Sequence, residues 1–380
     1  MITPINHSAV TAVHAQTFDI EPTGWVFAPG RVNLIGDHTD YNDGYVFPVA
    51  LEIGTFISYS RNNSGKVRAR SINMEATLER PLDAPAFDDW LDYVLGSLQA
   101  LARHQGAPLP TGLDLTIGST VPTGASVSSS AALEVATLRA ASQAFGLDLN
   151  PETLAQLAQE AENAFVGVNC GLMDQMASST GAPGSALFFD TKTLETALEP
   201  LPDDYAFLTL HSGLSRQLTS GAYNERREQC EAAAAAIGVP SLRTATLEQV
   251  DALPAGKTRD RARHVVTENA RVLVARDALR DGQMADFGRL MTQSHWSLSQ
   301  DFQTSTREVD ALVQSCLDRG AMGARITGAG FGGCIVVLVR RGEEETLVRS
   351  LRLAHPMAWH VATSTGLGQT ADASADASAG

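Results

Sequence analysis

Apolar and polar positions divide the chain into a strand-rich first part and a helix-rich second part. In the first hundred residues, short apolar or β-branched runs bounded by Gly, Pro and Asn predict strands, and these runs cover residues 25–28, 45–51, 55–60 and 66–71. Residues 90–104 then carry apolar side chains at helical spacing. Residues 112–117 alternate apolar and polar positions, which is typical of a half-buried strand.

Two central helices have well-marked ends. Residues 130–145 form a long apolar helical pattern that stops at Gly146, and glycine often follows the last turn of a helix because it adopts positive φ without strain. Asn150 and Pro151 come next, as an N-cap and a first helical residue. They predict a second helix that reaches about residue 165.

The second half contains a strand near residues 206–211 and several helices. The helical patterns cover residues 222–237, 260–279, 285–299 and 308–319. A Gly-rich turn, a strand at 334–340, a helix from about 343 and a last strand near 358 complete the pattern. This grouping predicts two α+β domains with an active cleft between them. We expect domains over residues 1–200 and 201–365, followed by a disordered tail over residues 366–380, which are rich in Ala, Ser, Gly and Asp.

Composition narrows the class of protein. The 380 residues are 44% hydrophobic and 19% charged, as in an ordinary soluble globular protein. The formal net charge of −15 disfavours nucleic acid and anionic membrane surfaces as partners. Four cysteines lie far apart without a CxxC pair, so we expect reduced thiols and a cytoplasmic location. No run of 18 apolar residues and no secretory signal is apparent.

A polar turn between apolar runs is the first candidate site. Residues 30–48 read GRVNLIGDHTDYNDGYVFP and hold a dense set of donors and acceptors: Arg31, Asn33, Asp37, His38, Asp40, Asn42 and Asp43. Such a set suits a ligand covered in hydroxyl groups. Solvated loops are polar as well, so the turn alone does not settle the matter.

A serine-rich loop is the second candidate site. Residues 122–131 read PTGASVSSSA and run directly into the helix LEVATLRAASQAF. The N–H groups and the positive dipole end at a helix N-terminus bind phosphates. No Lys or Arg lies between Arg103 and Arg139, so amides, hydroxyls and a metal ion must offset the phosphate charge, unlike in a Walker loop. The alternative is a Ser-rich N-cap on a core helix.

Two further motifs lie downstream. The segment GVNCGLMDQMAS places Asp174 among small and apolar neighbours, and Glu162 lies upstream on the preceding helix. A carboxylate in such a setting is either part of a structural salt bridge or catalytic. Gly328, Gly330 and Gly333 satisfy GxGxxG, but a strand follows them where a dinucleotide-binding fold requires a helix. We interpret these glycines as a turn that packs close to a neighbouring loop.

Together these motifs resemble galactokinases, which belong to the superfamily of galactose, homoserine, mevalonate and phosphomevalonate kinases. The resemblance spans about residues 25–340 and rests on GRVNLIGDHTDY, VPTGASVSSSAALEVA, CGLMDQ, SGAYNERR and TGAGFGGC in the same order. It implies the two-domain α+β sugar-kinase fold of that superfamily. It also implies phosphorylation of α-D-galactose at the anomeric O1, with ATP as co-substrate and Mg²⁺ as cofactor, in galactose catabolism. We expect a monomer.

The resemblance also implies roles for individual residues. Asp174 takes or orients the proton of the anomeric hydroxyl, and Arg31 stabilises negative charge on the phosphoryl group. The implied sugar-binding residues are Asp37, His38, Thr39, Asp40, Gly171, Asp174 and Tyr223. The implied nucleotide-binding residues are Gly124, Ala125, Ser126, Val127, Ser128, Ser129 and Ser130. Ser130 and Glu162 are the implied Mg²⁺ ligands.

Four positions depart from the family pattern, and one of them, Val127 in place of the usual Leu, is a mild apolar exchange. Asp37 stands where the family usually has Glu, so its reach toward the sugar's C5 or C6 is shorter by one methylene. Ser126 replaces a usual Gly and is strained if the loop requires positive φ. His211 stands where Asn is more frequent, and we interpret it as structural.

These departures leave other functions open. A related kinase could act on N-acetylgalactosamine, L-arabinose or galacturonate, and Asp37 is the residue that keeps this reading open. A non-catalytic galactose and ATP sensor is a third reading. Galactokinase-like sensors lack a Ser-Ala pair in the phosphate loop, whereas Ser130 and Ala131 are present here.

Overall fold

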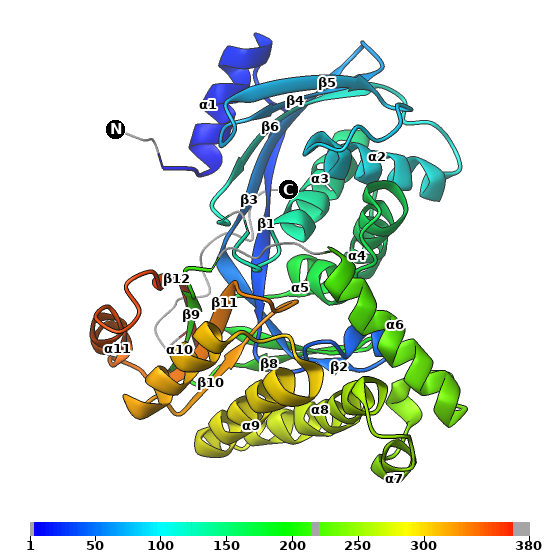
Figure 1. Ribbon diagram of the computed structural model, residues 1–380. Coiled ribbons are helices and arrows are strands. Elements are labelled where there is room, and N and C mark those ends of the chain that lie inside the picture. Colours follow the sequence, from blue (N-terminus) through cyan, green and yellow to red (C-terminus); the bar gives the residue numbers. More distant parts are fainter. Residues whose placement is uncertain (1–3, 123, 215–219, 368–380) are drawn as a thin grey trace.

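Two sheets and the helices that cover them form the molecule. The structure is a computed structural model that describes residues 4–122, 124–214 and 220–367. Within these residues the larger sheet has eight strands, in the order β2-β7-β3-β6-β4-β5 with β1 paired to β3 and β8 paired to β7. The smaller sheet has four strands, in the order β10-β11-β9-β12. Figure 1 shows the larger sheet running from the top of the molecule toward the smaller sheet below.

Two long strands form the spine of the larger sheet. β1 (Gly24–Asn33) and β3 (Pro48–Asn62) are antiparallel, and their register runs from Gly24 opposite Tyr59 to Asn33 opposite Pro48. β4 and β6 are parallel, whereas the other paired strands of this sheet are antiparallel. The remaining strands are β2 (Tyr45–Val46), β4 (Lys66–Ser71), β5 (Ala76–Pro81), β6 (Gly112–Ser119), β7 (Ser185–Asp190) and β8 (Thr196–Pro200).

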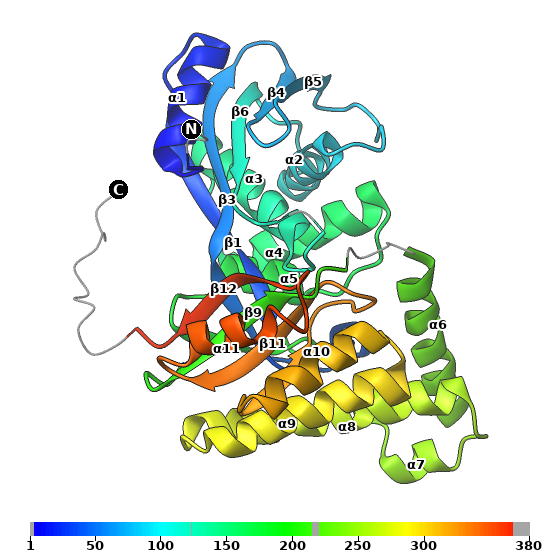
Figure 2. The same ribbon diagram turned by 60° about the vertical axis from the view of Figure 1, so that its left-hand side comes forward.

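Helices cover both faces of the upper part of this sheet. α1 (His7–Phe18) lies on one face, and the other face carries α2 (Leu91–Gln105), α3 (Ser129–Phe145), α4 (Pro151–Glu160) and α5 (Met173–Thr180) (Figures 1 and 2). The predicted stop at Gly146 is confirmed, since Gly146 has φ 67° and its N–H bonds back to the last turn of α3. The predicted Asn150 cap is also confirmed. α4 continues as a π-helical turn over Ala161–Val166, which carries Glu162.

The C-terminal part is built on the smaller sheet. Its strands are β9 (Tyr205–His211), β10 (Gly323–Ile326), β11 (Cys334–Arg340) and β12 (Trp359–Thr365). Its helices are α6 (Ser220–Ile237), α7 (Leu247–Asp251), α8 (Lys257–Arg280), α9 (Met284–Ser297), α10 (Arg307–Asp318) and α11 (Glu344–Leu351). Figure 2 shows α8, α9 and α10 stacked beneath the sheet. No helix in the described ranges is long and apolar enough to cross a membrane.

One hydrophobic core joins the two parts. Val32 and Phe47, from the first part, belong to the same buried cluster as Phe207, Phe287 and Val336, from the second. The rings of Phe47 and Phe287 lie 6.4 Å apart, centroid to centroid. The two halves therefore pack as one body, and a domain division at residue 200 stays a prediction.

The structure confirms most predicted elements and corrects some. The strands at residues 66–71 and 334–340 have the predicted bounds. Separate strands at 45–51 and 55–60 were a wrong prediction, because β3 runs unbroken from Pro48 to Asn62. The pattern did not predict α1, α5, α7, β5, β7, β8 or β10. Of the predicted tail, residues 368–380 lie outside the described residues.

Candidate active site

A cavity of about 550 Å³ gathers the candidate residues from both parts of the chain. Arg31, Glu162 and Asp174 line it from the first part, and Tyr223 and Gly328 line it from the second. This volume is within the range of small-ligand sites in proteins. The predicted location of the site, in a cleft between the two parts, is therefore matched by the cavity.

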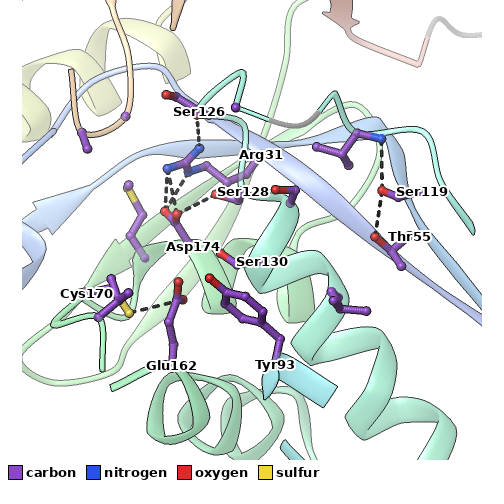
Figure 3. A pocket seen from close by; sticks show the side chains of 18 of the residues that line it. Arg31, Thr55, Tyr93, Ser119, Ser126, Ser128, Ser130, Glu162, Cys170 and Asp174 are labelled. Carbon is purple, nitrogen blue, oxygen red and sulfur yellow. Dashed lines mark hydrogen bonds and ion pairs between the residues drawn. The ribbon is translucent and has the colours of Figure 1, made fainter. Parts of the chain in front are cut away.

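Arg31 and Asp174 form a bidentate ion pair at the centre of the cavity (Figure 3). Nε of Arg31 donates to Oδ1 of Asp174 at 2.8 Å, and Nη2 donates to Oδ2 at 2.9 Å. The Arg31 side chain is 5% exposed and that of Asp174 is 29% exposed, so the carboxylate is the more accessible partner. Two parallel charge-assisted hydrogen bonds fix the orientation of both groups.

The serine-rich loop approaches this pair in a strained conformation. Ser126 has φ 61° and Ser128 has φ 63°, so both lie in the left-handed region. The loop thus places Ser126 at positive φ, which is the condition under which the sequence predicts strain at this residue. The Ser126 carbonyl accepts a hydrogen bond from Nη1 of Arg31 at 2.8 Å, and Oγ of Ser128 donates to Oδ2 of Asp174 at 2.6 Å. Of the predicted loop residues, those that line the cavity are Gly124, Ser126, Ser128, Ser129 and Ser130.

The glycine turn packs against this loop, as predicted. A Cβ atom on Gly333 would lie 2.5 Å from Oγ of Ser126, and one on Gly328 would lie 3.0 Å from the Ser126 carbonyl oxygen. Both glycines also have positive φ, at 75° and 77°. A side chain at either position would therefore displace the loop.

The polar turn lines the opposite side of the cavity. His38 and Asp40 lie there with Gly171 and Tyr223. A Cβ on Gly171 would lie only 1.8 Å from Oδ2 of Asp40, so this approach requires glycine. The ring of His38 lies 5.7 Å from that of Tyr223 and 4.6 Å from that of Phe302, centroid to centroid. Aromatic rings and a carboxylate together suit a sugar, which has both apolar faces and hydroxyl groups.

Three predicted site residues are buried behind the cavity wall. Oγ1 of Thr39 donates to the carbonyl oxygens of Gly36 and Tyr45, at 2.8 and 2.7 Å, and so braces the polar turn. Ala125 and Val127 are each 1% exposed and belong to the shared core. Their side chains do not line the cavity, so any contact that they make with a ligand comes through the backbone.

Asp37 is held by the protein itself, although it lines the cavity. Its Oδ2 accepts a hydrogen bond from Nη2 of the buried Arg325 at 2.5 Å, and its Oδ1 accepts from Asn33 at 3.1 Å and from the Gly328 N–H at 3.2 Å. Burial raises the pKa of Asp37, and Arg325 and Asn33 oppose that rise. The carboxylate of Asp37 is therefore largely occupied by partners within the protein.

Glu268 contacts both the polar turn and Arg325. Its Oε1 accepts a hydrogen bond from the N–H of Gly36 at 2.9 Å and lies 3.9 Å from Nη2 of Arg325. Burial alone raises the pKa of Glu268, but Arg271, His264 and Arg325 together lower it to about 2. Sequence reasoning missed Glu268 and Arg325, because only the folded chain brings them to a turn more than 200 residues away.

A second group of carboxylates lies beside Asp174. Burial and the charge of Asp174 raise the pKa of Glu162 to about 7, and burial with the same charge raises the pKa of Asp40 to about 6. Glu134 is buried, and burial and the charge of Glu162 raise its pKa well above the usual range. Nε2 of Gln175 donates to Glu162 at 2.6 Å and to Glu134 at 3.2 Å. Several carboxyl groups thus crowd this corner, and a bound cation would favour their ionised forms.

The residues present fit Mg²⁺ at this corner. Ser130 bonds to the carboxylate of Glu162, and both line the cavity, so two hard oxygen donors lie together. Within the described residues, Oε1 of Glu134 has no hydrogen-bond partner, which leaves further acceptor capacity nearby. Mg²⁺ prefers one or two protein oxygens and completes its coordination with water and phosphate.

The far end of the cavity is mostly apolar, and sequence reasoning missed it. Its wide apolar side chains suit a planar base: Met74, Trp90, Tyr93, Ile117, Val121 and Leu133. Polar groups at its edge include Thr55 and Ser119, whose hydroxyls lie 3.1 Å apart (Figure 3). These side chains come from several separate elements, so no local motif marks them. His211, in contrast, is not among the lining residues and stacks on Trp359 at 5.1 Å, which agrees with a structural role.

Comparison with known proteins gives consistent matches. The family described as "Galactokinase galactose-binding signature" matches residues 12–61, "GHMP kinases N terminal domain" matches residues 92–182, and "GHMP kinases C terminal" matches residues 275–355. A galactokinase of Mannheimia succiniciproducens is 41% identical over 82% of this chain and 84% of its own length. One of Actinobacillus succinogenes is 40% identical over 87% of this chain and 89% of its own length.

Solved structures agree with these matches. A galactokinase of Lactococcus lactis, in complex with galactose, has a TM-score of 0.90 and 32% identity to this chain, over 94% of this chain and 98% of that one. A mevalonate kinase of Methanococcus jannaschii shares the fold with a TM-score of 0.68 at 18% identity, over 90% of this chain and 98% of that one.

Proposed function

This chain belongs to the galactokinase family of ATP-dependent sugar kinases, and from that premise we propose that it phosphorylates α-D-galactose at the anomeric O1. The products are α-D-galactose 1-phosphate and ADP, which assigns the enzyme to galactose catabolism. The bidentate pair of Arg31 and Asp174, set between the serine-rich start of α3 and the polar turn, carries this proposal.

Asp174 and Arg31 act on the two reacting groups. As the bond between O1 and the γ-phosphorus forms and the bond to the β-phosphate oxygen breaks, the proton of O1 passes to Asp174 and then to water. ADP leaves with the electron pair of the broken bond. Arg31 stabilises negative charge on the transferring phosphoryl group. A loose transition state asks little of the base, so the positioning of O1 by Asp174 dominates.

The other residues hold the two substrates. The proposed sugar-binding residues are Asp37, His38, Thr39, Asp40, Gly171, Asp174 and Tyr223, with Thr39 acting through the turn that it braces. The proposed nucleotide-binding residues are Gly124, Ala125, Ser126, Val127, Ser128, Ser129 and Ser130, with Ala125 and Val127 acting through their backbones. The apolar end of the cavity accommodates the adenine ring.

We assign Mg²⁺ to Ser130 and Glu162, because their oxygens lie together beside other carboxyl groups. The bound cation supplies positive charge that offsets the triphosphate. We further propose a monomer in the cytoplasm, and the four free thiols of the chain support the location. Size-exclusion chromatography with light scattering tests the monomer.

The choice of sugar depends on Asp37. Arg325 occupies the carboxylate of Asp37, which supports a second candidate function as a kinase for a galactose-like sugar altered at C5 or C6. The non-catalytic sensor has less support, because Arg31 and Asp174 are paired in the cavity and Ser130 is followed by Ala131.

A coupled assay of ADP release separates these functions. The purified enzyme is supplied with Mg·ATP and, in turn, galactose, N-acetylgalactosamine, L-arabinose and galacturonate. We expect the highest kcat/KM for galactose. A higher kcat/KM for another sugar would reassign the substrate, and binding of galactose and ATP without ADP release would identify a sensor.

A further inference from the structure

Ser128 belongs to the phosphate loop and contacts the catalytic pair. It is the N-cap of α3, but its side chain makes no capping hydrogen bond. Its Oγ donates instead to Oδ2 of Asp174 at 2.6 Å (Figure 3). A serine N-cap ordinarily accepts a hydrogen bond from an N–H group of the first turn. The first-turn N–H groups of α3 are therefore left open to an anionic ligand while the hydroxyl reaches the carboxylate.

Arg31, on the neighbouring strand β1, also links the phosphate loop to Asp174. Its backbone N–H donates to the carbonyl oxygen of Val127 at 3.1 Å, and its Nη1 donates to that of Ser126 at 2.8 Å. A Cβ on Gly30 would lie 2.6 Å from the Val127 carbonyl oxygen, so strand and loop are in close contact. Within the described residues, each hydrogen bond that the Asp174 carboxylate accepts comes from Ser128 or from Arg31. Ser128 belongs to the loop, and Arg31 holds the loop through its hydrogen bonds to Ser126 and Val127.

We propose that Ser128 is a positioning residue that couples occupancy of the phosphate loop to the orientation of Asp174. A nucleotide bound to the loop fixes Ser128, and the hydroxyl of Ser128 passes that constraint to the carboxylate. Galactose, which contacts the same carboxylate, then binds more tightly when the nucleotide is present. By linkage, galactose strengthens nucleotide binding by the same factor. This inference rests on the proposed function.

Arg31 and Ser128 engage both oxygens of Asp174. Oδ2 accepts hydrogen bonds from Nη2 of Arg31 at 2.9 Å and from Ser128 at 2.6 Å, whereas Oδ1 accepts one from Nε of Arg31 and also lies 2.8 Å from Nη2. Removal of the Ser128 hydroxyl would therefore leave the carboxylate held by Arg31 alone.

Calorimetric titration of galactose, with and without the imidodiphosphate analogue of ATP and Mg²⁺, tests the coupling. In the wild-type enzyme we expect the analogue to tighten galactose binding by about fivefold or more. In Ser128→Ala we expect this factor to fall below about twofold, while the galactose Kd measured without nucleotide stays within about twofold of the wild type. We also expect kcat to fall by about 10- to 100-fold, because the carboxylate is less well positioned.

Two further variants separate the hydroxyl from the strained backbone. Ser128→Gly accepts φ 63° without strain but lacks the hydroxyl, so we expect it to lose the coupling as Ser128→Ala does. Ser142→Ala removes another buried hydroxyl of α3, one that donates to the carbonyl oxygen of Leu138 at 2.7 Å, and it should keep the wild-type coupling. Thermal unfolding of each variant verifies that it is folded.

A wild-type enzyme without coupling, or Ser128 variants that keep the wild-type factor and kcat, would overturn the inference. Full activity in Ser128→Gly together with loss in Ser128→Ala would overturn it as well, because backbone strain alone would then explain the effect. A wild-type enzyme that binds galactose but releases no ADP would contradict the proposed function instead, and the titration would still decide the coupling.

Discussion

The helices α3 and α4 follow one another along the chain but begin in opposite ways. At the start of α4, Asn150 has an extended backbone, and its side chain accepts a hydrogen bond from the N–H of Thr153 at 2.8 Å. At the start of α3, Ser128 has φ 63° and ψ 53°, makes no capping bond and directs its hydroxyl to Asp174. The start of α4 is therefore capped by a side chain of the protein, whereas the start of α3 has no side-chain cap.

The difference has an energetic meaning. A non-glycine residue in the left-handed region costs about 1–2 kcal/mol, and a missing N-cap costs about 1 kcal/mol. α3 carries both costs and α4 carries neither. The start of α3 is therefore arranged for a ligand at the expense of stability. Asp40 is a second group arranged for a ligand at the expense of stability, because its pKa is raised in the fold.

Asp174→Asn should produce the largest effect, a loss of kcat. The amide keeps the shape but loses the charge that holds Arg31 and Ser128 and that receives the proton. We expect kcat for galactose to fall by about 10³-fold or more, with galactose binding largely intact. ADP release and calorimetry measure the two quantities. Near-normal turnover would remove Asp174 from the mechanism.

Asp190→Asn is the matched control. Asp190 also forms a bidentate pair with an arginine, Arg243, at 3.1 and 2.9 Å, but it is not among the cavity-lining residues. We expect this variant to be less stable and to keep the wild-type kcat. Loss of turnover here would show that charge removal alone, at any buried ion pair, mimics the catalytic defect.

Asp40→Asn should stabilise the ligand-free enzyme and impair its function. The pKa of Asp40 is raised to about 6 in the fold, so the folded state binds the proton more tightly than the unfolded chain does. The free energy of unfolding therefore falls as the pH rises from about 4 to about 6, and the loss persists above that pH. The variant removes this loss, and we expect it to gain about 1–2 kcal/mol at pH 7.

The same substitution should weaken galactose binding. A neutral amide replaces a charged acceptor in the sugar site, so we expect KM for galactose to rise by about 10- to 100-fold. In the wild type, KM should rise as the pH falls through about 6. Unfolding curves and KM at pH 5, 6, 7 and 8 measure both effects. A destabilised variant, or a KM independent of pH, would contradict the assignment of Asp40.

Asn150→Ala should have a smaller and purely structural effect. Removal of the side-chain oxygen leaves the Thr153 N–H without its partner, so we expect a loss of about 1 kcal/mol in unfolding free energy. kcat and KM should stay at wild-type values. Denaturant unfolding and the ADP-release assay test this pair of outcomes, and a change in kcat would break the contrast between the two helix starts.

Ser126→Gly should have the smallest effect, and it should increase stability where Asn150→Ala decreases it. Glycine accepts φ 61° without strain, although it gains entropy in the unfolded chain. We expect a net gain of about 0.5 kcal/mol in stability, with the Arg31 contact to the carbonyl of residue 126 preserved. The melting temperature and the KM for ATP are the measurements. A clear loss of stability would show that the Ser126 side chain contributes more than its strain removes.

The sequence predicted those structural features that depend on neighbouring residues, such as helix ends. Gly146, Asn150 and Pro151 mark helix ends through their own backbone and side-chain preferences, and the structure places those ends accordingly. The serine loop, the polar turn and Asp174 were predicted by motif and by resemblance, and they meet in one cavity. In contrast, the pairing of Asp37 with Arg325, 288 residues away, has no local signal.

Elements stabilised by tertiary packing also escaped prediction. β7 and β8 are short strands within a larger sheet, and α1 has no regular apolar stripe because only Val10 and His14 are buried on it. Ser128 combines a left-handed backbone with a hydrogen bond to Asp174, 46 residues away, and the sequence of the loop has no signal for that partner. These features depend on contacts that form only in the folded chain.

The continuous core between the two parts restricts how this protein can be divided. Val32 and Phe47 share one buried cluster with Phe207 and Phe287, so a chain severed after residue 200 would expose large apolar surfaces on both fragments. We expect neither fragment to persist alone, and the intact enzyme to melt in a single cooperative transition. Any chimaera between relatives must therefore exchange the facing side chains together.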